Sequence, residues 1–461
     1  MKANHKLGEV IWPRLVANKL LNRPLGSHRF VADFPTMESL LDIESSDDST
    51  LHKKSSKGQK NTLKYKYPFA CMLSYKRVFV STWNVGGEPP SDDLNLEDWL
   101  DINNNSYDIY VLGFQEVVPL SAKNVLGPER SWVSMKWNSL IRETLNKSLS
   151  EKKNIANEET KLGERKKLHQ LREIAPSSCE GSSKKNAAEN FRCIISKQMV
   201  GILASVWVRG DLWQYVHHPS VSCVGCGVMG CLGNKGAVSV RFYLHDTSFC
   251  FVCCHLASGG KEGDVLLRNS DMADIFARTR FPRCGSLDFP QKILDHDRVV
   301  LLGDLNYRIS LPESKTRFLV EQKMWNILLE KDELKSEVSV GRTFEGWNEG
   351  LITFSPTYKY YPNSDEYYGC THNIKCEKRR APAWCDRILW HGRGWKQTRY
   401  EKCDSRLSDH RPVRAVFSVE VEIVRSLSSL GSFFSSERLD CSVDDFNLQS
   451  NDGPNNKMSS L

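Results

Sequence analysis

The chain has 461 residues, of which 40% are hydrophobic and 10% aromatic, and its formal net charge is +7. This composition excludes an intrinsically disordered chain, and no apolar run approaches the length that a membrane-spanning helix needs. The modest positive charge suits an anionic partner, so nucleic acid, acidic lipid and phosphorylated small molecules all remain open.

The chain divides into segments of different composition. Residues 1–35 carry apolar side chains at near-helical spacing and are expected to form a helical segment, whereas residues 36–74 are rich in Ser, Asp and Lys, as linkers are. A compact domain is predicted over residues 75–425, followed by a flexible, Ser-rich tail over residues 426–461. Within the domain, residues 138–190 contain no Phe, Trp or Tyr, which indicates a low-complexity insertion, partly helical and partly disordered.

Apolar runs typical of strands recur along the domain. They are RVFVSTWNV (77–85), IYVLGFQEV (109–117), VGILASVWV (200–208), AVSVRFYL (237–244), FCFVCCHL (249–256), RVVLLGDLN (298–306) and VRAVFSVEV (413–421). Helical patterns cover Asp264 to Arg280 and Thr316 to Leu334. Strands outnumber helices, and many are too closely spaced for a helical crossover. We therefore expect an α/β fold with two mixed sheets packed face to face and helices outside.

The cysteines and the amino terminus indicate a location inside the cell. The 15 cysteines are odd in number and scattered, and the first residues lack the apolar core of a secretory signal, so we expect reduced thiols in an intracellular, cytoplasmic protein. The spacing of Cys223, Cys226 and Cys231, just after His217 and His218, would suit zinc. Their glycine-rich, apolar surroundings favour a packed loop instead.

Several of the apolar runs end in polar residues. These residues are Asn84, Gln115, Glu116, His255, Asp304, Asn306, Ser408, Asp409 and His410. Any one of them could close a turn, but five such strand ends together point to a site. The oxygen ligands of Glu116 and Asn84 suit Mg²⁺, which binds through one or two carboxylates and leaves its other positions to water and substrate phosphate.

The remaining polar residues suit proton transfer and phosphate binding. Asp304 is a candidate to orient or deprotonate an attacking water. His255 and His410 are candidates to bind a scissile phosphate or to move protons, with Asp409 holding one imidazole in its tautomer. Together with the metal ligands, these residues predict metal-assisted hydrolysis of a phosphoester.

The motif order WNVGG, GFQE, HL, GDLNYRI, SDH resembles the exonuclease-endonuclease-phosphatase superfamily. The resemblance implies a four-layer α/β sandwich. It also implies metal ligands at Asn84 and Glu116, phosphate contacts from His255 and His410, and nucleophile positioning and transition-state stabilisation by Asp304 and Asn306. Asp409 then pairs with a histidine or supports the metal.

The later motifs favour one branch of that superfamily. FSPTYKYY, KRRAPAWCDRILW, GNKGAVSVRF and the HLASG segment followed by LLRNSD are similar to those of the inositol polyphosphate 5-phosphatases, and the match runs from about Val78 to Phe417. The resemblance implies that the 4-phosphate of an inositol ring is gripped by Tyr358, Lys359, Lys378 and Arg380. Asn234 and Lys235 then lie near the 1-phosphate side, and Arg268 and Asn269 join the substrate-binding set.

Two features depart from the common pattern. The segment after His255 carries Lys261 and several glycines in place of a more acidic, alanine-rich loop, and residues 138–190 do not belong to the shared catalytic core. With the amino-terminal IWPRLVANKLLN, the insertion is similar to the plant, type I-like branch of the family.

The expected reaction is Mg²⁺-dependent removal of the 5-phosphate from phosphatidylinositol 4,5-bisphosphate, its 3,4,5-trisphosphate relative or soluble inositol 1,4,5-trisphosphate, by a monomer that binds no nucleic acid. A nuclease of the same superfamily and a catalytically silent phosphoinositide-binding scaffold are the alternatives. Peripheral membrane contact through Phe433 and Phe434, or through the apolar face near Trp12, also stays open.

Overall fold

The computed structural model describes residues 28–33, 70–102, 107–147, 190–283, 289–369 and 380–425. Almost all of them belong to one compact unit that includes Leu73–Ile423. The expected helix around Trp12, most of the linker, most of the insertion and the Ser-rich tail lie outside the described residues. The segment 28–33 is extended, and its Val31 forms an antiparallel bridge with Ser196 at the edge of a sheet.

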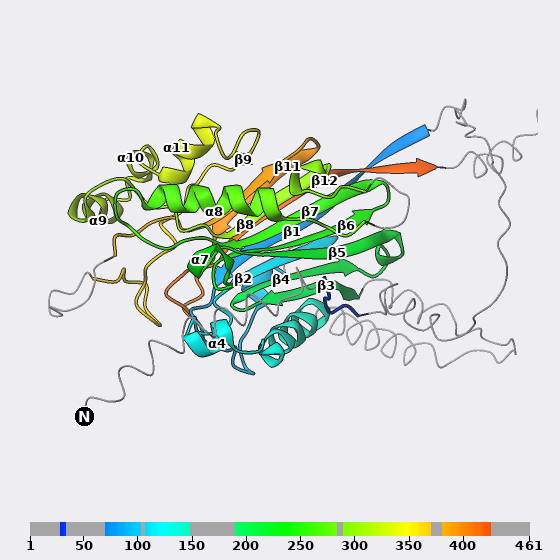
Figure 1. Cartoon of the computed structure of the whole chain (residues 1–461), viewed down its shortest axis with the longest axis horizontal. Coiled ribbons are helices and arrows are strands. Elements are labelled where there is room, and N and C mark those ends of the chain that lie inside the picture. The colour runs from blue at the N-terminus through cyan, green and yellow to red at the C-terminus, as the bar shows by residue number, and fades with distance from the viewer. Residues whose placement is uncertain are drawn as a thin grey trace, which may run out of the picture. The chain divides into compact units, whose positions relative to one another are not determined.

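Two six-stranded mixed sheets form the centre of the described unit (Figure 1). In spatial order, the first sheet contains β11 (Trp395–Lys402), β12 (Val413–Arg425), β1 (Ala70–Asn84), β2 (Ile109–Gln115), β4 (Ile202–Arg209) and β3 (Phe191–Met199). The second contains β5 (Val216–Gly225), β6 (Gly236–Leu244), β7 (Thr247–His255), β8 (Arg298–Asp304), β10 (Asp386–His391) and β9 (Asn348–Glu349). The pairs β1–β2 and β7–β8 are parallel, whereas β2–β4, β3–β4, β5–β6, β6–β7, β8–β10, β9–β10 and β11–β12 are antiparallel.

Helices cover the outer face of each sheet, as Figure 1 shows. On the side of the second sheet lie α8 (Asp264–Arg278), α9 (Glu313–Glu321), α10 (Trp325–Leu329) and α11 (Glu333–Val340). On the other side lie α4 (Ala122–Leu126) and a helix over residues 131–147. The shorter helices are α3 (Glu97–Leu100), α7 (Val228–Cys231), η2 (Trp213–Tyr215) and η3 (Ile293–Asp295). The predicted four-layer sandwich is confirmed.

Alternation along the strands creates three apolar layers. In β1, Val78 and Val80 point into the core between the sheets, whereas Phe79 and Trp83 point to the core under the helix over residues 131–147. A third core joins the second sheet to α8. Because successive side chains of a strand face opposite sides, strands buried on both faces appear in the sequence as continuous apolar runs.

Two boundaries differ from the sequence prediction. The helix expected over Thr316–Leu334 is three helices, because Lys323 adopts a left-handed φ of 53° after α9, and Asp332 caps α11 by accepting from the backbone NH of Lys335 at 2.8 Å. The expected insertion begins later than residue 138. Ile141 and Leu145 are 0% and 2% exposed in the core under the first sheet, so this part of the segment belongs to the sandwich.

Candidate active site

Three site residues form one row across the second sheet. His255 at the end of β7 pairs in register with Asp304 at the end of β8, and Asp304 pairs with Asp386 at the start of β10. Gly303 makes this approach possible, because its φ is +150° and a Cβ at this position would lie 2.1 Å from the carbonyl oxygen of Cys254. Neighbouring strands thus present an imidazole and two carboxylates at the same edge.

Asp304 is the centre of the site and is 1% exposed. Its Oδ2 lies 3.3 Å from His255 Nε2, 3.9 Å from His410 Nε2 and 3.0 Å from the Nδ2 donor of Asn84. Burial opposes the negative charge, but His410, His255 and Lys235 outweigh burial and hold the pKa of Asp304 well below its usual range. Asp304 is therefore a carboxylate at neutral pH.

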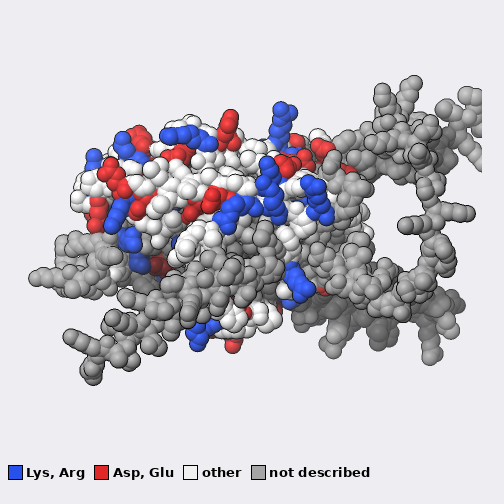
Figure 2. Space-filling model, in the orientation of Figure 1, with Lys and Arg blue, Asp and Glu red and all other residues white. Residues whose placement is uncertain are grey.

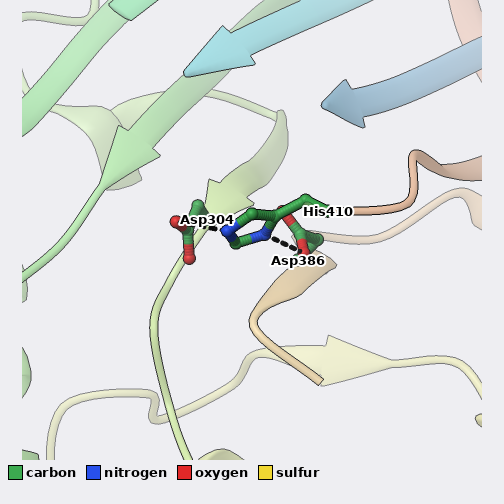
Figure 3. A group of neighbouring side chains, drawn as sticks. All are labelled: Asp304, Asp386 and His410. Carbon is green, nitrogen blue, oxygen red and sulfur yellow. Dashed lines mark hydrogen bonds and ion pairs between the residues drawn. The ribbon is translucent and has the colours of Figure 1, made fainter. Parts of the chain in front are cut away.

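His410 lies between two carboxylates (Figure 3). Its Nδ1 is 2.9 Å from Asp386 Oδ2, and its Nε2 faces Asp304. Burial disfavours the imidazolium, but Asp386 and Asp304 favour it more and raise the pKa of His410 to about 9. Asp304, Asp386 and His410 lie close enough to hold a metal ion together, and in the absence of a metal the two carboxylates favour the imidazolium form of His410.

Asp386 takes a role that the sequence analysis gave to Asp409. The expected pairing of Asp409 with a histidine is not what the structure has: Asp409 Oδ2 accepts from Lys359 Nζ at 2.6 Å, and Asp386 holds the imidazole of His410. The sequence does not single out Asp386, because this residue begins a strand, whereas the predicted site residues follow the ends of apolar runs. Its only sequence signal was its place in the motif PAWCDRIL.

The first sheet contributes the candidate metal ligands. Asn84 ends β1, and its Nδ2 donates to Glu116 Oε1 at 3.3 Å and to Asp304 Oδ2. Glu116 follows β2 with a left-handed φ of 53°, and its side chain is 29% exposed. The Oδ1 of Asn84 accepts from the backbone NH of Gly86 at 3.0 Å, so it is the carboxylate oxygens of Glu116 and Asp304 that lie together and fit a hard divalent cation.

Lys235 lies deeper than the sequence analysis expected. Its Nζ is 2.5 Å from His255 Nε2, so its ammonium lies beside His255 and Asp304. Burial lowers the pKa of Lys235, although Asp304 and Glu116 favour its charge. Burial and the neighbouring ammonium lower the pKa of His255 as well, which makes His255 a neutral partner and His410 the cationic histidine.

Asn306 lies at the same edge, two residues after Asp304. Its backbone NH donates to Asp304 Oδ1 at 3.1 Å, and its φ is 57°. The side chain is 3% exposed, with Nδ2 donating to the carbonyl of Leu256 at 3.2 Å and Oδ1 accepting from Arg308 Nη2 at 2.6 Å. Arg308 was not among the expected site residues.

Two of the residues expected to grip the 4-phosphate, Tyr358 and Lys359, contact His410 and Asp409 respectively. The Tyr358 ring is 4.5 Å from the His410 ring, and Lys359 Nζ, which pairs with Asp409, lies 5.1 Å from the Tyr368 ring centre. Arg380 is half-buried, and Lys378 lies outside the described residues.

Helix α9 holds the chain around the segment that contains Lys378. Arg317 Nη2 donates to the carbonyls of Tyr368 and Arg380, at 2.7 and 2.9 Å. These two carbonyls flank residues 370–379, so a single side chain fixes the ends of that segment.

Three of the expected substrate residues also contact other parts of the protein. Arg268 is 0% exposed and donates to Glu333 Oε2 at 2.6 Å, and Asn269 Oδ1 accepts from the Tyr307 hydroxyl at 2.7 Å. Asn234 packs against Gly227 of the loop after β5, since a Cβ on Gly227 would lie 2.0 Å from Asn234 Oδ1. These contacts join α8 to α11 and to the segment after β8, and they pack the two ends of the β5–β6 loop against each other.

The cysteines and histidines with zinc-like spacing do not gather. Among the described residues, the group able to hold a metal ion is Asp304, Asp386 and His410, which contains no cysteine. Cys226 instead directs its Sγ toward the carbonyl of Asp271, at 3.8 Å. The packed-loop interpretation of this segment is supported.

Comparison with known proteins assigns this geometry to a family. The model of Endonuclease/Exonuclease/phosphatase family 2 matches residues 81–416. In Arabidopsis thaliana, Type IV inositol polyphosphate 5-phosphatase 9 is 55% identical over 441 residues, which cover 94% of this chain and 97% of that protein. Type I inositol polyphosphate 5-phosphatase 8 of the same plant is 44% identical over 427 residues, covering 89% and 86%.

A solved structure agrees with these relatives. The inositol polyphosphate 5-phosphatase domain of SpSynaptojanin, in complex with inositol (1,4)-bisphosphate and calcium ion, is 27% identical with a TM-score of 0.60, over 80% of this chain and 90% of that one. The chain therefore belongs to the endonuclease/exonuclease/phosphatase family and, within it, to the inositol polyphosphate 5-phosphatases.

Proposed function

We propose that the enzyme hydrolyses the 5-phosphate of inositol rings that also carry a 4-phosphate, with Mg²⁺ as cofactor. The substrates are phosphatidylinositol 4,5-bisphosphate and soluble inositol 1,4,5-trisphosphate, with the 3,4,5-trisphosphate lipid as a further candidate. The observation that carries the proposal is the contact of the Tyr358 ring with His410 at 4.5 Å, which puts the Tyr358–Lys359 pair beside the reaction centre. A ring bound at these residues presents its neighbouring phosphate to Asp304.

The related crystal structure supports this substrate class. Its bound inositol (1,4)-bisphosphate is what remains when inositol 1,4,5-trisphosphate loses its 5-phosphate. At 27% identity and a TM-score of 0.60, the shared fold and family make the same reaction the best assignment for this chain.

The reaction adds a water oxygen to phosphorus and breaks the bond from phosphorus to the C5 oxygen of inositol. The products are inorganic phosphate and a free 5-hydroxyl, which receives the proton that the water gives up. The Asp304 carboxylate accepts a hydrogen bond from the water and aims its lone pair. The His410 imidazolium and Lys235 donate to the phosphoryl oxygens, where negative charge accumulates.

Glu116 and Asn84 are the residues that would hold the metal. When bound there, Mg²⁺ supplies Lewis-acid polarisation of a phosphoryl oxygen and offsets charge in the transition state. Asn84 already touches both carboxylates of the site, Glu116 and Asp304, so its amide fixes their separation.

We further propose a cytoplasmic monomer that contacts membranes only at their surface. No helix in the described ranges has both the length and the apolar character needed to cross a bilayer. Leu266 and Leu267, 66% and 54% exposed at the start of α8, follow the loop after His255 and are candidates to touch a bilayer. On the face in Figure 2, Lys and Arg alternate with Asp and Glu, which speaks against a nucleic-acid stripe.

Phosphate release tests the proposal. We expect release with Mg²⁺ from soluble inositol 1,4,5-trisphosphate and from vesicles containing phosphatidylinositol 4,5-bisphosphate, but no release from either after chelation of the metal or in the Asp304→Ala variant. The ratio of the two rates gives the preferred form of the substrate. Absence of release from both substrates by the intact protein would overturn the assignment, whereas release that survives Asp304→Ala would overturn the site.

A further inference from the structure

Arg308 is a buried cation that joins three loops of the active site. It is 8% exposed, its Nε donates to the carbonyl of Gly259 at 3.1 Å, and its Nη2 donates to Asn306 Oδ1 at 2.6 Å. The guanidinium lies 4.7 Å from the centre of the Tyr358 ring. One side chain thus contacts the loop after β7, the side chain of Asn306 two residues after β8, and the Tyr358 ring that packs on His410.

The contact with Asn306 fixes which end of the amide faces which neighbour. Nδ2 of Asn306 donates to the carbonyl of Leu256, while Oδ1 accepts from Arg308. A flipped amide would set its NH₂ against the guanidinium and its oxygen against a carbonyl oxygen, so both contacts would become repulsive. Arg308 therefore selects one orientation.

The selected orientation leaves a donor for the substrate. An amide nitrogen carries two N–H groups, and the carbonyl of Leu256 uses one of them. Asn306 is held at this place by its left-handed backbone and by the Asp304 carboxylate, which accepts from its NH. The second N–H is available to a phosphoryl oxygen beside Asp304.

Arg308 is itself anchored from outside the site. Its backbone NH donates to Glu333 Oε2 at 2.8 Å, and the same oxygen accepts from the fully buried Arg268 at 2.6 Å. Glu333 is the first residue of α11. The position of the guanidinium is thus set by a helix that touches neither metal ligand in the described structure.

We propose that Arg308 is a positioning residue, which locks the Asn306 amide so that an N–H points at the phosphate during hydrolysis. This inference rests on the proposed function and on the transition-state role that the family resemblance implies for Asn306. The ordinary alternative is that Arg308 only stabilises the fold through buried contacts.

Replacement of buried arginines separates these two roles. We expect Arg308→Met to lower kcat about 100-fold with a small change in KM, because losing one oriented donor weakens the transition state alone. Arg241→Met is the matched control, since Arg241 is also buried, donates to the carbonyls of Pro282 and Pro290, and lies over the ring of Phe281. The control is expected to lower Tm comparably and to keep kcat.

A double-mutant cycle with Asn306→Ala gives the decisive result. If Arg308 acts through Asn306, adding Arg308→Met to Asn306→Ala lowers kcat less than twofold further, although each change alone costs about 100-fold. Losses that multiply would overturn the inference. A normal kcat in Asn306→Ala would instead overturn the role of Asn306, a different and recognisable outcome.

If Arg308→Met does not fold, Arg308→Lys provides a second test of the positioning role. Lysine retains the buried charge, but its single ammonium cannot bind both Gly259 and Asn306 in the fork geometry of arginine. We expect a folded protein with Tm near that of the wild type and kcat lowered at least tenfold. A kcat equal to that of the wild type would contradict the proposal.

Discussion

The inner and outer charges of the active site are held in different ways. Asp304, Asp386 and His410 are 1%, 0% and 5% exposed, and each is fixed by contacts with the others. Lys359 and Asp409 form a single ion pair at 2.6 Å, and their side chains are 27% and 25% exposed. Water screens the charges of the outer pair but not those of the inner group. The interaction free energy of the outer pair is therefore much smaller.

This difference assigns the two groups different tasks. A buried, mutually fixed group keeps its geometry whatever the substrate, which suits the chemical step. A screened pair exchanges partners at little cost, so a substrate phosphate can replace Asp409 beside Lys359. Changes in the inner group should therefore reduce turnover on every substrate, and changes in the outer pair should alter the choice among substrates.

The largest effect is expected for Asp304→Asn. The amide keeps the shape of Asp304 but not its charge, so the water loses its acceptor and His410 loses a partner. We expect kcat to fall about 10³- to 10⁴-fold on soluble and vesicle substrates alike, with KM little changed, by initial-rate measurement of phosphate release. A loss confined to one substrate would break the division between inner and outer groups.

Asp386→Asn should change the pH dependence of kcat. In the proposed mechanism the His410 imidazolium binds the phosphate, and Asp386 and Asp304 raise the pKa of His410 to about 9 against the opposing effect of burial. Wild-type kcat should thus hold from neutral pH and fall as pH rises through about 9. Without the Asp386 charge, the pKa of His410 drops and kcat is lost at lower pH, with about 10²-fold less activity at pH 8.

Thr357→Val is the matched control for that profile. The Thr357 hydroxyl donates to Asp386 Oδ2 at 2.7 Å, so this variant removes a contact of Asp386 without removing its charge. The alkaline limb should stay close to that of the wild type. A shift as large as that of Asp386→Asn would mean that the geometry of Asp386, not its charge, sets the profile.

The sequence predicts the strand-end part of the site well. His255 and Asp304 end apolar runs, and parallel pairing of β7 and β8 brings such ends together. The rule that site residues follow strand ends does not find Asp386, because antiparallel pairing puts the start of β10 beside the end of β8. The strand β10 lies within the segment KRRAPAWCDRILW, whose motif is interpreted from the sequence as a substrate-recognition element and not as a strand.

Closeness in the sequence also led to a wrong prediction of which acidic side chain pairs with His410. Asp409 is the neighbour of His410 in the chain, yet its carboxylate turns to Lys359, while Asp386 reaches the imidazole from another strand. Arg268 was expected to contact substrate, yet it is fully buried and pairs with Glu333, because residue patterns do not reveal depth below the surface. Such contacts depend on long-range packing.

Lys359→Met should have a smaller, substrate-dependent effect. Loss of the ammonium weakens binding of the 4-phosphate, and we expect kcat/KM to fall about tenfold or more on 4,5-bisphosphorylated substrates. On an inositol phosphate that lacks the 4-phosphate, kcat/KM should change little. Equal losses on both would place Lys359 in the chemical step and so contradict the separation of the two groups.

The smallest effect is expected at the apolar start of α8. Leu266 and Leu267 are exposed next to the loop that follows His255, where a bilayer would lie if the substrate is a lipid. Burial of a single methylene group is worth about 0.8 kcal/mol, or roughly fourfold in partitioning, so Leu266→Ser with Leu267→Ser should slow release from vesicles several-fold. Release from soluble inositol 1,4,5-trisphosphate is the internal control and should not change. If the rates on vesicles and on soluble substrate fall together, these leucines support the loop after His255 and do not contact a membrane. The outer part of the site would then be as rigid as the inner group.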